Sequence, residues 1–83
     1  MSFSIEWDIK VLDFLRKLQQ NISERIVNKV ESIKENPFRF LEHYEGKYYK
    51  LRIGGYRALI DIDFEKKVLI VQVLDKRGRI YKR

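Results

Sequence analysis

The sequence lacks cysteine altogether and has only one histidine and one proline among its 83 residues. Without cysteine, neither disulfide bonds nor thiolate metal sites can form. No run of about eighteen apolar residues occurs, so we expect no membrane-spanning segment. The first residues, MSFSIEWD, include an acid and no long apolar stretch, so we expect no signal peptide. These absences fit a reducing compartment, and we expect a cytoplasmic protein without a metal or other cofactor.

The chain has the length of one small domain, which we expect to span residues 1–83. Its hydrophobic fraction of 45% is ordinary for a globular protein and is sufficient for a core. A domain of this size buries a limited share of its surface, so its stability alone should be modest.

The cations are concentrated in two stretches, residues 47–57 and 76–83. Together these 19 residues hold nine of the 18 Lys and Arg and none of the 12 Asp and Glu, and the net charge is +6. Clustered cations with interleaved tyrosines are typical of a surface that binds nucleic acid. The plainer alternative is a solubilising tail together with an edge strand that lysines protect from aggregation. The separation into two stretches favours the nucleic-acid interpretation.

The stretch KYYKLRIGGYR, residues 47–57, predicts two short strands joined at Gly54 and Gly55. Adjacent glycines tolerate the positive φ angles of a two-residue hairpin turn. Such a turn fixes the pairing of the two strands. The predicted register places Ile53 opposite Tyr56, Arg52 opposite Arg57, and Lys50 opposite Leu59.

Alternation along these strands predicts one apolar face and one cationic face. The apolar face, which can form a core, consists of Tyr49, Leu51, Ile53, Tyr56, Ala58 and Ile60. The cationic face consists of Tyr48, Lys50, Arg52, Arg57 and Leu59. Its three cations meet no carboxylate before Asp61, and like charges across a ladder are unfavourable unless something neutralises them. We therefore interpret this face as an anion-binding site.

The first half of the chain predicts a strand followed by two helices. Residues 3–7 alternate as a half-buried strand does, and Asp8 can cap a helix that ends near residues 19–21. We expect Ser23 to cap a second helix, which Pro37 stops, and the short link predicts an antiparallel helical hairpin. Residues 38–46 are predicted to form a loop in which His43 is a surface residue without a special role.

The second half of the chain predicts strands at residues 56–62 and 68–74, a turn at 75–78 and a last short strand at 79–82. In extended geometry Arg77, Arg79 and Tyr81 would lie on one side of that last strand. The fold class is therefore α+β, with an N-terminal strand and a helical hairpin packed on one face of a mainly antiparallel sheet of three to five strands.

The motif KLRIGGYR followed by the terminal KRGRIY, in a chain of this length and element order, resembles the RelE branch of the RelE/ParE toxin superfamily. The resemblance implies a metal-independent, ribosome-dependent endoribonuclease that cuts messenger RNA in the ribosomal A site and inhibits translation. It also implies a cognate RelB-like antitoxin as partner, in addition to the ribosome and mRNA.

The resemblance assigns catalytic roles to Lys50, Arg57, Arg77 and Tyr81. RNA-binding roles fall to Lys47, Tyr48, Arg52, Arg79, Lys82 and Arg83. One position departs from the family, because Tyr48 stands where some members have a second lysine. Lys47 is adjacent, but strand alternation would point it to the opposite face.

RNA can be cut without a metal when its own 2′-hydroxyl attacks the neighbouring phosphorus, giving a 2′,3′-cyclic phosphate and a free 5′-hydroxyl. The enzyme must then align the backbone and neutralise a phosphorane-like charge. Our hypothesis places Arg57 and Arg77 on the scissile phosphate, because a guanidinium also fixes phosphate orientation. Lys50 stabilises charge or serves as base, and Tyr81 donates a proton to the 5′-oxygen or stacks on a base.

Several alternatives stay open at this point. Arg52 and Arg79 could be structural, with Arg52 pairing with Asp61, and Tyr56 is expected in the core. The whole chain could instead be a ParE-like inhibitor that binds DNA gyrase, or a non-catalytic RNA-binding module.

Overall fold

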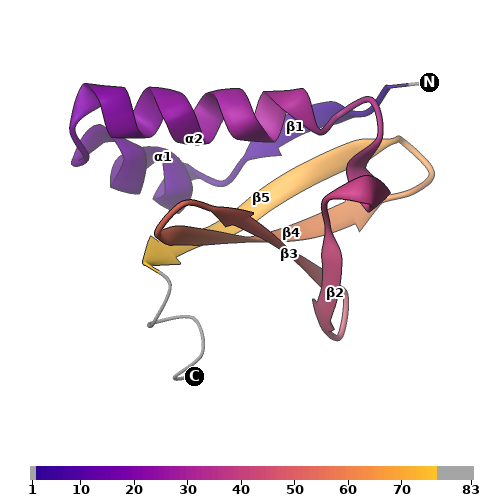
Figure 1. The fold of residues 1–83 in the computed structure, drawn as a ribbon. Helices are drawn as coiled ribbons and strands as arrows, with labels where there is room; N and C mark the ends of the chain where they lie inside the picture. Colours follow the sequence, from indigo (N-terminus) through magenta and orange to yellow (C-terminus); the bar gives the residue numbers. More distant parts are fainter. Residues whose placement is uncertain (1, 77–83) are drawn as a thin grey trace.

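Two helices pack on one face of a five-stranded sheet in the computed structural model, which describes residues 2–76 (Figure 1). The elements are β1 (Ser4–Trp7), α1 (Ile9–Arg16), α2 (Gln20–Ser32), the 3₁₀ helix η1 (Pro37–Arg39), β2 (Glu42–Glu45), β3 (Tyr48–Ile53), β4 (Tyr56–Asp63) and β5 (Val68–Lys76). This arrangement confirms the predicted α+β class. The strand expected at residues 79–82 lies outside the described residues.

The strands lie in the order β1-β5-β4-β3-β2. β1 runs parallel to β5, and the other three pairings are antiparallel. The core fills the space between the sheet and the helices, because the apolar stripes of both helices face the apolar side of the sheet. Its fully buried large side chains are Ile26, Ile33, Leu51, Ile60, Leu69, Val11, Val30 and Val71.

The β3–β4 hairpin has the predicted register. Ile53 lies opposite Tyr56, Arg52 opposite Arg57, and Lys50 opposite Leu59. At the turn, Gly54 has a φ of +59°, a conformation that costs an L side chain about 1–2 kcal/mol. The predicted apolar face is also confirmed, since Leu51, Ile53, Ala58 and Ile60 are all buried and Tyr56 packs edge-on against Phe14. The turn glycines therefore direct the lysine and arginines of this hairpin away from the helices.

The first helix begins as predicted and the second does not. The Asp8 carboxylate accepts a hydrogen bond of 2.8 Å from the Lys10 backbone N–H. The second helix, in contrast, begins at Gln20 with the extended residue Gln19 as its cap, so the prediction of Ser23 as the cap was wrong. Ser23 lies inside the first turn, where its hydroxyl donates to the Gln20 carbonyl. The chain reverses over only three residues between the helices.

The loop predicted at residues 38–46 is instead largely structured. Pro37 opens η1, and β2 then pairs antiparallel with β3 along the edge of the sheet. The sequence of β2, EHYE, shows no apolar alternation because an edge strand exposes most of its side chains to water. The turn predicted at residues 75–78 was wrong in its first half as well, because β5 continues through Asp75 and Lys76.

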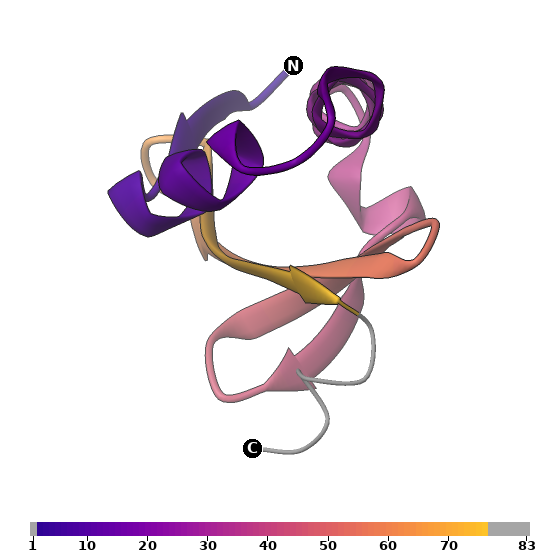
Figure 2. The ribbon, with the colours of Figure 1, turned by 90° about the vertical axis from the view of Figure 1, so that its left-hand side faces the viewer.

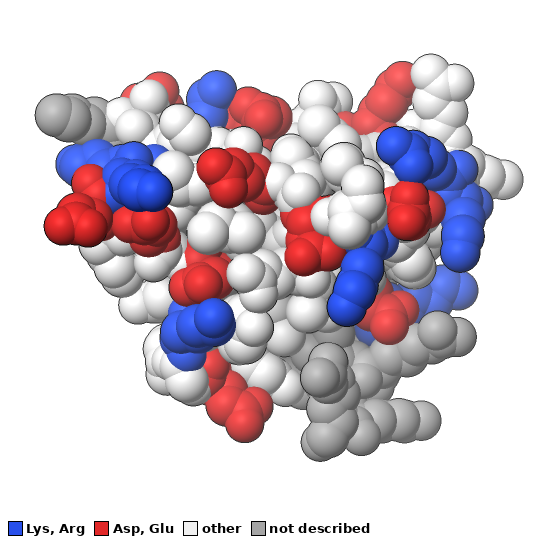
Figure 3. Space-filling model, turned by 180° about the vertical axis from the view of Figure 1, so that it is seen from behind, with Lys and Arg blue, Asp and Glu red and all other residues white. Residues whose placement is uncertain are grey.

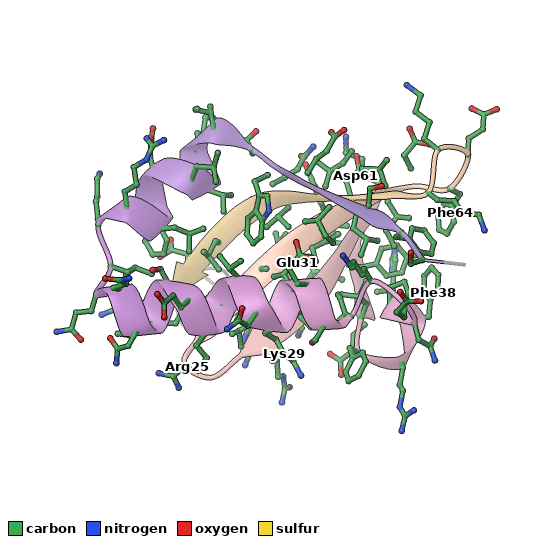
Figure 4. All side chains as sticks on the ribbon, turned by 90° about the horizontal axis from the view of Figure 1, so that it is seen from above. Arg25, Lys29, Glu31, Phe38, Asp61 and Phe64 are labelled. Carbon is green, nitrogen blue, oxygen red and sulfur yellow. The ribbon has the colours of Figure 1, made fainter. Side chains whose placement is uncertain are left out.

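Aromatic side chains close the end of the molecule where η1 meets the β4–β5 turn. Phe38 and Phe64 stack with an interplanar angle of 2° and a centroid distance of 5.9 Å, and Figure 4 shows them side by side. Phe38 also meets Phe3 and Tyr49 edge-on. These contacts tie the segment before β2 to the N-terminal strand.

The sheet curls away from the helices, so that β2 and β3 turn below β4 and β5 (Figure 2). Two irregularities in pairing accompany this curvature. One lies in β2 between His43 and Glu45, and the other lies opposite the Leu59–Ile60 step of β4. Bulges of this kind bend a strand and increase its twist. The outer face of the sheet, opposite the helices, is therefore concave.

Candidate functional site

Lys50 and Arg57 both project from the outer face of the β3–β4 hairpin, as their predicted alternation requires. The Lys50 side chain is only 12% exposed, and Arg57 is 4% exposed as a residue. Arg57 is the one charged residue that is buried in the part of the chain the structure describes. Partial removal from water strengthens the field of a cation at short range. The hairpin thus holds two sheltered positive groups on one face.

Carboxylates lie closer to these cations than the sequence suggested. Glu42 of β2 is opposite Lys50, and the Lys50 Nζ lies 3.6 Å from the Glu42 Oε1. Asp75 of β5 is opposite Arg57 in the β4–β5 ladder, which places both on the same face. The expectation of a cationic face without carboxylates was therefore wrong, because Glu42 was assigned to a loop and Asp75 to a turn.

The ion pairs of Lys47 and Lys50 at this face are loose. Their N–O distances of 3.5 and 3.6 Å exceed the range of about 2.7–2.9 Å of a good charge-assisted hydrogen bond. The Glu42 carboxylate is 63% exposed and Lys47 is 62% exposed. Each pair thus joins one exposed partner to one sheltered partner at a long distance, so the exposed partner can move away without breaking a short hydrogen bond.

Lys47 reaches the outer face, contrary to the prediction from alternation. It lies in the turn between β2 and β3, where the alternation of a strand does not apply. Its Nζ lies 3.5 Å from Asp61 Oδ2 and 5.6 Å from the centre of the Tyr48 ring. Asp61, considered above as a partner for Arg52, therefore pairs with Lys47. Arg52 is exposed and, with Lys29 and Phe40, borders a small depression beside β3.

A cavity of about 450 Å³ opens on the outer face and includes Leu59, the residue opposite Lys50 in the ladder. It is lined by Tyr44, Glu45, Gly46, Lys47, Tyr48 and Leu59. The Tyr48 hydroxyl donates a hydrogen bond of 3.0 Å to the Gln72 Oε1. Sequence reasoning singled out Tyr48 but missed Tyr44 and Gln72, because the roles of both depend on strand pairing.

The remaining predicted site residues, Arg77, Arg79, Tyr81, Lys82 and Arg83, lie outside the described residues. The described chain ends at Lys76, which pairs with Tyr56, the neighbour of Arg57. The basic terminal segment therefore begins at the strand position beside Arg57.

The single histidine is an exposed residue of β2. Its Nε2 lies 2.8 Å from the Gly46 carbonyl oxygen, and its ring meets Tyr49 edge-on. Within residues 2–76, no group of three or more His, Asp and Glu side chains is placed to hold a metal ion. No helix in the same range is long and apolar enough to cross a membrane.

Charges of both signs are interspersed on the side of the molecule shown in Figure 3. The helices also carry local ion pairs, such as Arg16 with Asp13 and Lys34 with Glu31. Arg25 and Lys29 project from the side of α2 away from α1 (Figure 4). The side shown in Figure 3 has the pattern of an ordinary solvated exterior.

Comparison with known proteins identifies the family of this chain and solved structures that share its fold. The family model described as the ParE toxin of the type II toxin-antitoxin system parDE matches residues 5–80. A search of curated proteins finds no significant match. The chain therefore belongs to the RelE/ParE superfamily, the toxins of type II toxin–antitoxin systems.

Solved structures of RelE toxins and RelBE complexes share this fold. A chain of the toxin–antitoxin complex RelBE2 from Mycobacterium tuberculosis superposes with a TM-score of 0.84 at 21% identity, covering 93% of this chain and 100% of that one. The RelE–RelB complex from Pyrococcus horikoshii gives 0.77 at 22% identity, with 95% and 99% covered. A mutant of the E. coli toxin RelE in the free state gives 0.78 at 26% identity, with 99% and 93% covered.

Proposed function

We propose that this toxin is a ribosome-dependent endoribonuclease that cuts messenger RNA in the ribosomal A site and so inhibits translation. The observation that carries the proposal is the placement of Lys50 and Arg57 on the outer face of one hairpin, where both are sheltered from water. A cavity lined by Tyr44 and Tyr48 opens on the same face. The likeness to RelE toxins supports it as well.

In this proposal the RNA supplies its own nucleophile. The 2′-oxygen attacks the adjacent phosphorus, the bond from phosphorus to the 5′-oxygen breaks, and the 5′-oxygen leaves with a proton. Arg57 and Arg77 bind the scissile phosphate, where a planar guanidinium can donate two parallel hydrogen bonds. Lys50 stabilises the phosphorane charge or takes the proton of the 2′-hydroxyl, and Tyr81 protonates the 5′-oxygen or stacks on a base.

The remaining cations contribute binding. Lys47 and Arg52 are exposed and can exchange water or a loosely held carboxylate for phosphate. Arg79, Lys82 and Arg83 add electrostatic contacts to ribosomal RNA and message. Because Arg57 is buried in this structure, the mechanism requires its guanidinium to become accessible when RNA binds.

The partner that holds the toxin inactive is, in this proposal, a RelB-like antitoxin. Structural relatives of the chain come from RelBE and RelE–RelB complexes. An acidic antitoxin segment that pairs with Lys50 and Arg52 would block the proposed site directly.

The family model favours a second candidate, a ParE-like protein that inhibits DNA gyrase by binding it, without nuclease chemistry. One experiment separates the two. The purified chain is added to ribosomes programmed with a message, and in parallel to a gyrase supercoiling reaction.

The proposal predicts cleaved message with 2′,3′-cyclic phosphate and 5′-hydroxyl ends, loss of cleavage in Tyr81→Phe, and unchanged supercoiling. Intact message together with blocked supercoiling would establish the gyrase inhibitor. Intact message with salt-sensitive RNA binding would establish a non-catalytic RNA-binding module.

A further inference from the structure

The bulge in β2 re-aims one tyrosine toward the outer face. Glu42 pairs with Lys50 and His43 with Tyr49, but Glu45 then pairs with Tyr48, which leaves Tyr44 as the extra residue. Bulges redirect a side chain in this way and often lie at sheet edges beside functional sites. The Tyr44 ring lines the cavity, and the Lys50 Nζ lies 5.9 Å from the ring centre.

The second bulge supplies a brace for Tyr48. Leu59 pairs with Val73 and Ile60 pairs with Val71, so Gln72 is the extra residue of β5. Its side-chain oxygen accepts the hydrogen bond from the Tyr48 hydroxyl. The hydrogen bond fixes the ring of Tyr48 before any ligand arrives, which reduces the entropy lost on binding.

The cavity between these rings suits a flat, uncharged group. Its volume of about 450 Å³ lies within the range of about 300–1,000 Å³ that is usual for small-molecule sites. The side chain of Leu59 contributes an apolar surface. Glu45 also lines the cavity and would repel a phosphate, so charge favours a base over the backbone here.

We propose that this cavity, the Tyr44–Tyr48 pocket, binds one unpaired nucleobase of RNA, stacked on the ring of Tyr44 and bordered by Tyr48. Gln72 is a positioning residue that acts through Tyr48. The inference rests on the proposed function for the identity of the ligand as RNA. It also gives a physical role to Tyr48, which replaces a lysine of some relatives with an aromatic ring beside the proposed catalytic Lys50.

The test uses a short single-stranded RNA that carries one 2-aminopurine and 2′-fluoro groups, which prevent cleavage. Stacking on tyrosine quenches the fluorescence of 2-aminopurine, so a loss of fluorescence indicates that the base has entered the pocket. Titration of the RNA with protein gives the affinity. Parent chain is compared with Tyr44→Leu, Tyr44→Phe, Gln72→Leu and Phe64→Leu. Phe64 is the matched aromatic control, because it is 58% exposed on the β4–β5 turn and stacks on Phe38. Far-UV circular dichroism verifies that each variant is folded.

We expect Tyr44→Leu to abolish quenching and to weaken binding about 5- to 150-fold, since stacking of a base on an aromatic ring is worth about 1–3 kcal/mol. Tyr44→Phe keeps the ring and should retain quenching, and Gln72→Leu should weaken binding severalfold. Phe64→Leu should match the parent. An RNA with an abasic site in place of 2-aminopurine should bind parent and Tyr44→Leu equally.

The nucleobase-pocket hypothesis and the endonuclease hypothesis can be disproved independently of each other. If the parent cleaves ribosome-bound message while Tyr44→Leu quenches and binds like the parent, the pocket is overturned and the nuclease stands. If the parent cuts no message but its quenching depends on Tyr44, the pocket stands and the nuclease is overturned. A parent chain that neither binds the RNA nor quenches its 2-aminopurine overturns the pocket.

Discussion

Lys50 of β3 lies directly opposite Glu42 of β2, and its ammonium nitrogen is 3.6 Å from the Glu42 carboxylate. The two side chains differ sharply in exposure, at 12% for Lys50 and 63% for Glu42. The lysine is therefore held in place by its surroundings, while the carboxylate can leave for water. In the proposed function, Glu42 would therefore compete with phosphate for the same ammonium group.

Removing that competitor should separate the roles of the two residues. We expect Glu42→Gln to cleave ribosome-bound message at least as fast as the parent, with a stability change below about 1 kcal/mol. Lys50→Met should slow cleavage by about 100-fold, since it removes a charge from the transition state. Single-turnover cleavage rates measure both, with Lys66→Ala as a control for loss of an exposed lysine. A loss in Glu42→Gln as severe as that in Lys50→Met would show instead that the carboxylate performs a chemical step.

The cleavage rate should depend on the planar shape of the Arg57 guanidinium as well as on its charge. Arg57→Ala is expected to lower the cleavage rate about 100-fold or more, and Arg57→Lys should restore little, because a lysine lacks the planar fork. Thermal unfolding of each variant shows whether the fold survives. Cleavage by a folded Arg57→Lys at the parental rate would contradict the proposed bidentate contact with phosphate.

RNA binding should also change the environment of Arg57. The residue is 4% exposed, so its guanidinium protons should exchange slowly with water in the free chain. On addition of an uncleavable RNA, the Arg57 side-chain signal in a nitrogen-15 NMR spectrum should shift, because the guanidinium then donates hydrogen bonds to phosphate. A signal that is identical with and without bound RNA would argue against contact with the phosphate.

Lys47 should contribute to affinity through counterion release. Each phosphate contact on a single strand contributes about 0.7 to the slope of log affinity against log salt. Lys47→Ala should therefore reduce the magnitude of that slope by about 0.7, measured by fluorescence anisotropy over a salt series. Lys66→Ala, in the β4–β5 turn, should leave the slope unchanged. Equal slopes for both variants would place Lys47 outside the RNA interface.

Alanine substitutions of the two turn glycines, Gly54 and Gly55, should differ in their effect on the free energy of unfolding. Gly54 has a φ of +59°, and a Cβ there would meet only the Arg25 Nη1 at 3.8 Å, an ordinary contact. Gly54→Ala should therefore cost about 1 kcal/mol through backbone strain alone. Gly55 does not have a positive φ, and a Cβ there meets nothing within 4 Å, so Gly55→Ala should change stability by less than about 0.5 kcal/mol. Urea unfolding of both variants measures the difference, and equal costs would contradict this view of the turn.

The parts of the fold that local chemistry determines could be predicted from the sequence. The register of β3 and β4 follows from Gly54 and Gly55, and the start of α1 follows from Asp8. The strand β2 could not be predicted, because EHYE has no apolar alternation and gains its geometry from pairing with β3. Membership of the RelE/ParE superfamily, in turn, was confirmed by the match to the ParE toxin model over residues 5–80.

The candidate site was predictable in its residue types and less so in its surroundings. Alternation placed Lys50 and Arg57 on one face, but the carboxylates of Glu42 and Asp75 depend on strands β2 and β5. Tyr44 enters the cavity only because a bulge shifts the register of β2, and no sequence motif marks that bulge. Burial of Arg57 likewise depends on tertiary packing, which charge patterning does not report.

Primer extension on messages from cells that express the toxin tests the central claim most directly. The account predicts discrete cleavage within translated codons for the parent chain and for Lys66→Ala, and intact messages for the double variant Lys50→Met, Arg57→Ala at equal protein level. Intact messages with the parent chain, or cleavage that persists in the folded double variant, would contradict the claim that these two cations act on the RNA backbone.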